Sequence, residues 1–296
     1  MSTTIYKSPA GEVKMMELYN KQLAKLKIEY KTTQIDTRFG STHVIITGPE
    51  HAPPVLLFQG GNTTNPYILE KFLPLAKHFR LYAPDTVGHP GKSAQNSLSP
   101  RDTSYGKWAV DIMDGLGLAQ ASVVGTSWGG GILLQLGACT PERITKAVLI
   151  VPAGIANSSM RRVIKDLAIP MFLYQLFPNR KRLLQAIQPL ASDPDEDTIE
   201  MVQTVFHHVK VKAEMPGNVT KEELAAFTAP TMLFAAENDI IFPANRVIPQ
   251  AKKVIPNLTV AEQLNGASHL FFQSYDQLQY VQKQISDFLL HAAKES

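Results

Sequence analysis

The chain has 296 residues, of which 44% are hydrophobic and 19% charged, with a formal net charge of +3. This balance suits a globular protein with a sizeable core, and it excludes a disordered chain and a fibrous repeat. The single cysteine, Cys139, excludes an intrachain disulfide and a multi-cysteine zinc site, so nothing requires an oxidising compartment.

Basic residues cluster only weakly, at Arg161 and Arg162 and in residues 179–182. A solvated face is the simpler interpretation of both clusters, so we do not expect nucleic acid as a partner. The first thirty residues lack the apolar stretch of a secretory signal, and no apolar run in the chain reaches membrane-spanning length. We therefore expect a cytoplasmic protein with no stable membrane insertion.

The N-terminal part predicts a helix followed by a hairpin. Residues 12–27 carry apolar side chains at helical spacing among charged ones, which indicates a short amphipathic helix. A packing or lid helix is a simpler interpretation than a membrane anchor. Residues 27–48 then alternate apolar and polar positions around a turn at Phe39, Gly40 and Ser41, as two antiparallel strands would.

The next part of the chain alternates between two patterns. Continuous apolar runs predict strands that are covered on both faces, as in a parallel sheet. Helix-like stretches separate several of these runs, and this alternation implies right-handed βαβ crossovers and an α/β fold. The apolar runs are residues 54–61, 79–88, 121–127, 145–154 and 230–239, and the helix-like stretches are residues 65–78, 99–118 and 128–140.

The alternation breaks between residues 153 and 227, where apolar residues recur at helical spacing between prolines. A structureless loop of that length is unusual in a compact domain, so we predict a helical cap (lid) over 153–227, inserted into a core formed by 1–152 and 228–296. An apolar cluster in this insertion is best interpreted as lid core, although some members could line an acyl or alkyl pocket. The cluster comprises Met171, Phe172, Tyr174, Leu176 and Phe177.

Ser127 lies where a predicted strand turns into a predicted helix that begins near Trp128. The G-x-S-x-G spacing is complete over residues 125–129, and such a sharp turn exposes the serine hydroxyl above the carboxyl edge of the sheet. The pentapeptide alone also fits an ordinary turn serine. The strand before it and the helix after it favour a nucleophile elbow.

A serine nucleophile needs a general base, and an imidazole base needs a carboxylate that orients it. Of the histidines after Ser127, His269 alone follows a strand-like run in a loop of small residues, so we expect it to be the base. Asp239, in the loop after the preceding strand, is the expected acid. Glu237 is its rival, and a turn or capping role for Asp239 stays open.

The oxyanion of an acyl-transfer intermediate is usually held by two backbone N–H groups. We expect these groups to belong to Trp128 and Gly61. Four further residues are candidates for the substrate pocket: Gln59, Asn62, Phe172 and Leu176. The neighbouring histidines 207 and 208 would point about 100° apart on a helix, so no metal site is expected.

These residues resemble the α/β-hydrolase fold family over residues 27–291, through the segments "QGG", "DTVGHPGKS", "GTSWGG", "AENDIIFP" and "NGASH". The resemblance implies a mostly parallel, eight-stranded type of sheet flanked by helices, with a helical cap between strands 6 and 7, as in lid-bearing serine esterases and peroxidase-like hydrolases. It departs from the family in two places. Gln59 stands where many relatives have histidine, and Pro90 is added before Gly91, while His89 is expected to help fold that loop.

The sequence therefore predicts a serine hydrolase that cleaves a small or medium, largely apolar carboxylic ester through an acyl-enzyme on Ser127, without a metal or cofactor. The same triad serves thioesterases, amidases or peptidases, lactonases, C–C hydrolases and acyltransferases, and these alternatives stay open. A haloalkane dehalogenase is disfavoured because it needs a carboxylate nucleophile. A non-catalytic ligand-binding module is the alternative from another class, and the chain could act as a monomer or a homodimer.

Overall fold

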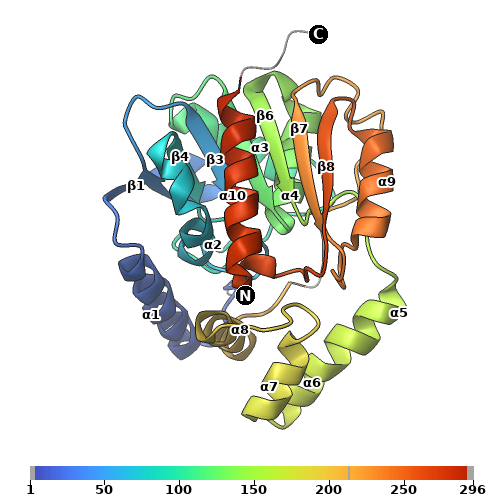
Figure 1. The fold of residues 1–296 in the computed structure, drawn as a ribbon. Helices are drawn as coiled ribbons and strands as arrows, with labels where there is room; N and C mark the ends of the chain where they lie inside the picture. The colour runs from blue at the N-terminus through green and yellow to red at the C-terminus, as the bar shows by residue number, and fades with distance from the viewer. Residues whose placement is uncertain (1–3, 213, 292–296) are drawn as a thin grey trace.

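A mixed eight-stranded sheet forms the centre of the structure, a computed structural model that describes residues 4–212 and 214–291 (Figure 1). Its order is β1-β2-β4-β3-β5-β6-β7-β8, with β1 and β2 antiparallel to their neighbours and the other pairs parallel. The strands are β1 (Tyr30–Thr37), β2 (Gly40–Thr47), β3 (Pro54–Phe58), β4 (Arg80–Pro84), β5 (Ala121–Thr126), β6 (Ile144–Ile150), β7 (Thr231–Ala236) and β8 (Leu258–Leu264). The predicted fold class is confirmed.

Helices cover both faces of the sheet, which explains why its central strands are apolar without interruption. Side chains of α3 (Ser104–Gly115), α4 (Trp128–Cys139) and α9 (Ala244–Val254) pack in one buried cluster with one set of strand residues. Side chains of α2 (Asn65–Phe72) and α10 (Tyr275–Leu290) pack in a second cluster with the alternate set.

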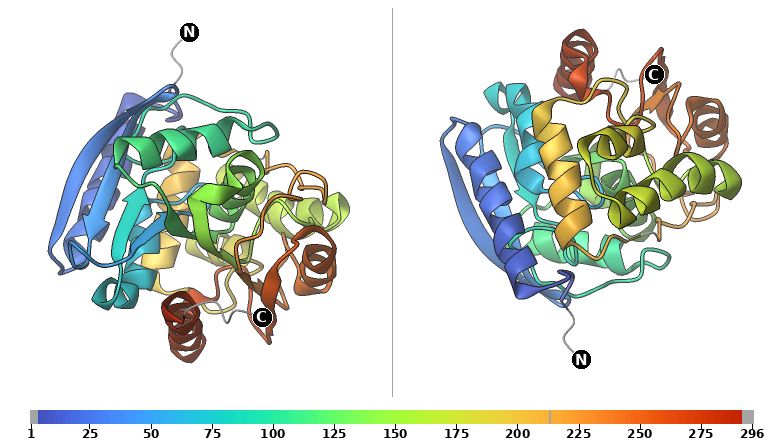
Figure 2. Two further views of the ribbon diagram at one scale, coloured as in Figure 1. Left: turned by 90° about the horizontal axis from the view of Figure 1, so that it is seen from above. Right: turned by 90° about the horizontal axis from the view of Figure 1, so that it is seen from below.

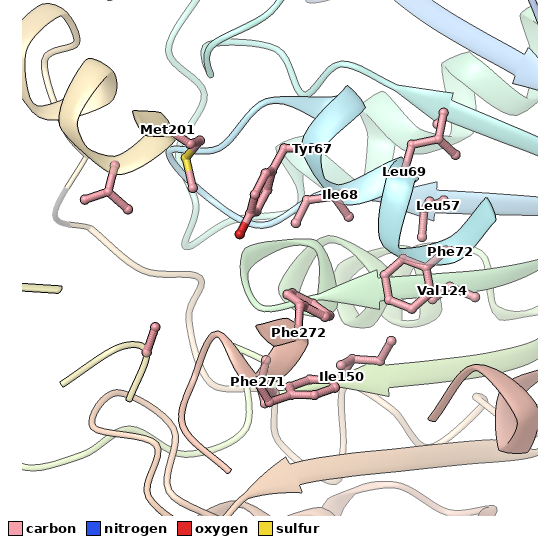
Figure 3. Close-up of a cluster of buried hydrophobic side chains, with 14 of the residues drawn as sticks. Leu57, Tyr67, Ile68, Leu69, Phe72, Val124, Ile150, Met201, Phe271 and Phe272 are labelled. Carbon is pink, nitrogen blue, oxygen red and sulfur yellow. The ribbon is translucent and has the colours of Figure 1, made fainter. Parts of the chain in front are cut away.

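The second cluster continues from the sheet into the helices beneath it. Figure 3 shows Leu57, Val124 and Ile150 of the sheet facing Phe72 of α2 and Phe272 near the C-terminal helix. Met201 of α8 (Glu196–His208) belongs to the same cluster. The core is therefore shared between the sheet and a helix of the segment that joins β6 to β7.

The described residues between β6 and β7 form four α-helices and one π-helical turn. They are α5 (Met160–Val163), the π-helix η3 (Ile164–Ala168), α6 (Ile169–Leu176), α7 (Arg180–Ile187) and α8. Residues 210–212 and 214–230 contain neither an α-helix nor a strand of the sheet, and Leu224 and Phe227 pack in the cluster of α3, α4 and α9. The helical part of this segment thus ends with α8.

The N-terminal helix α1 (Pro9–Lys25) packs along α8, as seen from below in the right-hand view of Figure 2. Ser8 caps α1 by accepting a hydrogen bond from the Gly11 N–H, and Lys21 pairs with Glu200 of α8 at 2.7 Å. The predicted helix is therefore present, and it packs against α8. None of the helices that the described residues form is long and apolar enough to cross a membrane.

The apolar cluster of α6 differs from the expected lid core. Met171 and Tyr174 are buried, but Phe172, Leu176 and Phe177 are 58%, 53% and 56% exposed. Met171 and Tyr174 are thus buried as lid-core residues would be, Phe172 is exposed but lines the cavity described below, as the pocket alternative expected, and Leu176 and Phe177 do neither. Helical spacing identifies apolar positions, but α6 carries apolar residues on more than one side and only one side meets the rest of the protein.

Candidate active site

A strained turn between β5 and α4 positions Ser127. Its backbone angles are φ 51° and ψ −114°, in a region that residues other than glycine rarely occupy. The turn is held by hydrogen bonds in which the Ser127 N–H donates to the Ile150 carbonyl at 2.8 Å and the Ser127 carbonyl accepts from the Gly130 and Ala153 N–H groups. The hydroxyl is therefore fixed at the carboxyl edge of the sheet.

His269 and Asp239 meet Ser127 at this edge. His269 Nε2 lies 3.0 Å from Ser127 Oγ, and His269 Nδ1 lies 2.7 Å from Asp239 Oδ2. The other Asp239 oxygen, Oδ1, accepts hydrogen bonds from the N–H groups of Ile241 and Phe242. A carboxylate that only accepts requires the proton of His269 on Nδ1, which leaves Nε2 free to accept from the serine hydroxyl.

Glu237, the rival acid, lies elsewhere. Its side chain is exposed, and its Oε2 accepts a hydrogen bond from the Gly266 N–H at 2.7 Å. The Asn238 N–H donates to the Ala267 carbonyl beside it. Glu237 therefore stabilises the loop that carries His269 through this hydrogen bond and does not contact the imidazole.

The loop after β3 lies directly against the elbow. A Cβ atom on Gly60 would lie 3.6 Å from Ser127 Cβ, and one on Gly61 would lie 3.2 Å from Trp128 Cβ. The Trp128 N–H belongs to the first turn of α4, where backbone donors have no partner within the helix. The two N–H groups expected to hold an oxyanion, those of Gly61 and Trp128, therefore belong to adjacent segments.

Gln59 is fully buried beneath this loop instead of facing a substrate. Its amide nitrogen donates to the Thr63 carbonyl at 2.8 Å, and the Thr63 hydroxyl donates to the Gly60 carbonyl at 2.7 Å. These bonds fold the glycine loop. Gln59 thus supports the loop from behind, which differs from the pocket position expected from the sequence.

Asn62 joins the glycine loop to two distant segments. Its backbone N–H donates to His89 Nδ1 at 3.2 Å, and its side-chain amide exchanges two hydrogen bonds of 3.1 Å with the backbone of Lys212, just after α8. Asn62 adopts a left-handed φ of 54°. Burial and the nearby Lys212 ammonium lower the pKa of His89, so its ring stays neutral and can accept this bond.

We predict that Asn62→Gly weakens this connection without backbone strain, because glycine adopts the left-handed region freely. Loss of two side-chain hydrogen bonds is expected to lower the free energy of unfolding by about 1–3 kcal/mol, and displacement of the glycine loop to lower kcat about tenfold. Urea denaturation and steady-state kinetics measure both effects. Asn62→Asp, which keeps only the acceptor, should be intermediate, and unchanged kcat in both variants would contradict the assignment.

A cavity of about 430 Å³ opens at Ser127 and His269. Its lining is mostly apolar and comes both from the sheet edge and from helices between β6 and β7, and its volume is in the range of small-molecule sites. Asn62 and Phe172 line it as expected, whereas Leu176 lies on the outer side of α6. The helices contribute Val163, Leu167, Ala168, Met171, Phe172, Gln175, Met201, Val202, Val205 and Phe206.

Sequence analysis missed the contributions of α8 and Lys212 to this cavity. The apolar residues Met201, Val202 and Val205 recur at helical spacing. This spacing predicts an apolar side of the helix, but it does not show that this side lines the cavity. Burial lowers the pKa of Lys212 to about 8. Among the described residues, no three His, Cys, Asp or Glu side chains gather so that they could hold a metal ion.

Comparison with known proteins gives matches over nearly the whole chain. Residues 53–177 match the family described as the alpha/beta hydrolase fold. Carboxylesterase YbfK of Bacillus subtilis is 26% identical over 95% of both chains, and a haloalkane dehalogenase of Mycolicibacterium paratuberculosis is 31% identical over 72% of this chain and 67% of its own length. The crystal structure of naproxen esterase from Bacillus subtilis superposes with a TM-score of 0.80, at 22% identity, over 96% of this chain and 99% of that one.

Proposed function

This chain belongs to the α/β-hydrolase fold family, and we propose that it is a carboxylic-ester hydrolase whose nucleophile is Ser127. The observation that carries the proposal is the continuous relay from Asp239 through His269 to the Ser127 hydroxyl, with distances of 2.7 and 3.0 Å. Full-length similarity to carboxylesterase YbfK supports ester cleavage. A dehalogenase-type reaction would need a carboxylate where this chain has Ser127.

In the proposed reaction, His269 Nε2 takes the proton of the Ser127 hydroxyl while Oγ attacks the ester carbonyl. The N–H groups of Gly61 and Trp128 stabilise the oxyanion that forms. Asp239 stabilises the imidazolium, which then donates its proton to the leaving alcohol. Water enters next, activated by the same base, and releases the carboxylic acid and free Ser127.

The helices α5 to α8 serve in this proposal as the cap over the substrate, because they supply much of the apolar cavity wall. Such a wall favours a small or medium, largely apolar acyl or alkyl group over a charged one. The substrate in this proposal is a small molecule, and the protein is a cytoplasmic monomer or homodimer. The location is supported by the sequence, whose lone cysteine requires no oxidising compartment.

A series of substrates tests whether the bond cleaved is an ester. We expect p-nitrophenyl esters to be hydrolysed with kcat/KM rising from acetate to chains of middle length, because added methylenes fill the apolar cavity, and then falling when the chain exceeds it. Matched thioesters and anilides of the best acid serve as controls, with the Ser127→Ala protein as the blank. Turnover of a thioester or an anilide without turnover of any ester would replace ester hydrolysis by that reaction.

A further inference from the structure

The outer side of the α5–α6 segment is an unusual concentration of exposed apolar side chains. Thirteen large hydrophobic residues are exposed in the described part of the chain, and seven of them fall within residues 160–177. Figure 1 shows α5, α6 and α7 below the sheet at the edge of the molecule, with α7 next to α8. The seven, here called the outer stripe, are Met160, Ile164, Ile169, Phe172, Leu173, Leu176 and Phe177.

The outer stripe lies opposite a second apolar side that lines the cavity. Val163, Leu167 and Met171 face the cavity at helical spacing, while Ile164 and Ile169 belong to the outer stripe. These two isoleucines are five residues apart across the π-helical turn, which keeps them on one side of the helix. Exposed apolar side chains that gather on one side of a helix usually mark a surface that binds a partner, and the outer stripe is such a surface.

Basic residues flank the outer stripe at both ends. Arg161, Arg162 and Lys165 lie on α5 and η3, and residues 180–182 ("RKR") begin α7. The only acidic residue between positions 157 and 190 is Asp166, so this stretch has a net charge of +5 whereas the whole chain has +3. The rest of the chain is therefore slightly acidic, and the basic charge is concentrated around the stripe.

The outer stripe is also continuous with the substrate cavity. Phe172 lines the cavity and is nonetheless 58% exposed, so one side chain belongs to both surfaces. A molecule bound against the stripe would thus lie beside a wall of the cavity. The outer stripe therefore lies where an apolar substrate could enter the cavity.

We propose that the outer stripe and its basic flanks bind the surface of an anionic phospholipid membrane, with α5 and α6 lying in the interface and not crossing it. Apolar side chains can enter the boundary between headgroups and acyl chains, and each Lys or Arg near the surface adds electrostatic attraction. A second copy of this chain fits the charges less well. A two-fold interface would place the same patch against itself and bring its basic flanks together, and Glu196, which pairs with Arg180 at 2.5 Å, is already engaged within one copy.

The proposal goes beyond ester hydrolysis and is tested by binding alone. The full chain is sedimented with vesicles of phosphatidylcholine, and with vesicles of equimolar phosphatidylcholine and phosphatidylglycerol. We expect binding to the anionic vesicles only, weakening as salt rises. Arg161→Glu with Arg162→Glu should weaken it by at least about fivefold for each arginine, and Ile164→Ser with Leu173→Ser by at least about tenfold.

Val13→Ser is the matched control, because Val13 is 56% exposed on α1, outside the stripe. It should bind vesicles as the unchanged protein does. A cooperative thermal unfolding transition like that of the unchanged protein shows that each variant is folded, independently of any hydrolytic activity. Absence of vesicle binding, or equal binding by all variants, would overturn the proposal. A dimer that the Ile164→Ser and Leu173→Ser protein no longer forms, without vesicle binding, would assign the stripe to a second copy.

Discussion

Asp239→Asn is expected to lower kcat for ester hydrolysis about 10⁴-fold and to change KM little. Asp239 Oδ1 accepts from two backbone N–H groups, so the amide oxygen of asparagine will occupy that position and its NH₂ group will face His269. His269 Nδ1 must then accept a hydrogen bond, which moves the imidazole proton to Nε2. The Ser127 hydroxyl thereby loses the acceptor that activates it.

Glu237→Gln is the matched control for this loss. The same carboxylate-to-amide change, two residues away, leaves an amide oxygen that can still accept from the Gly266 N–H, so it should keep kcat within about threefold. Steady-state kinetics of both variants on one ester measure the two values of kcat and show which carboxylate is the acid. The assignment of the acid fails if Asp239→Asn keeps more than about a tenth of the activity, or if Glu237→Gln loses as much as Asp239→Asn.

Gly129→Ala is expected to destabilise the fold by about 3 kcal/mol and to abolish most activity. A Cβ atom at this position would lie 2.3 Å from the Phe58 carbonyl oxygen and 2.8 Å from that of Gln59. Both obstacles are backbone atoms at the end of β3, so the turn at Ser127 and the glycine loop would have to separate. The midpoint of urea unfolding, at an unchanged m-value, measures the loss of stability.

Gly117→Ala provides the comparison for that substitution. Gly117 has a positive φ of 68°, but a Cβ atom there would meet nothing within 4 Å. Only backbone strain is added, so the expected cost is about 1 kcal/mol with activity unchanged. If both variants lost the same free energy of unfolding, close packing at the turn would not explain why position 129 is glycine.

The sequence predicted the sheet well because burial on both faces leaves a strong local pattern. Uninterrupted apolar runs located β3 to β7, and the G-x-S-x-G spacing located the turn at Ser127. The helix expected from residue 99 begins at Ser104 instead. There Asp102 accepts a hydrogen bond from the Ser104 N–H, a local turn that apolar spacing does not register.

The features that the sequence did not predict depend on contacts between distant residues. Asn62 and Lys212 are 150 positions apart, so their reciprocal hydrogen bonds leave no periodic pattern. Gln59 was expected to face the substrate because its loop does, but its own side chain turns inward to Thr63. The exposure of Phe172 was missed because apolar spacing identifies a helix side without showing whether anything covers it.

The most direct test of the account is covalent labelling by a fluorophosphonate, which reacts with an activated serine. We expect intact-protein mass spectrometry to show one added phosphonyl group, and peptide mapping to place it on Ser127. The Ser127→Ala protein should remain unlabelled, and labelling of the Asp239→Asn protein should be slower by orders of magnitude. Absence of labelling, or equal labelling of the Ser127→Ala protein, would contradict the claim that Ser127 is the nucleophile.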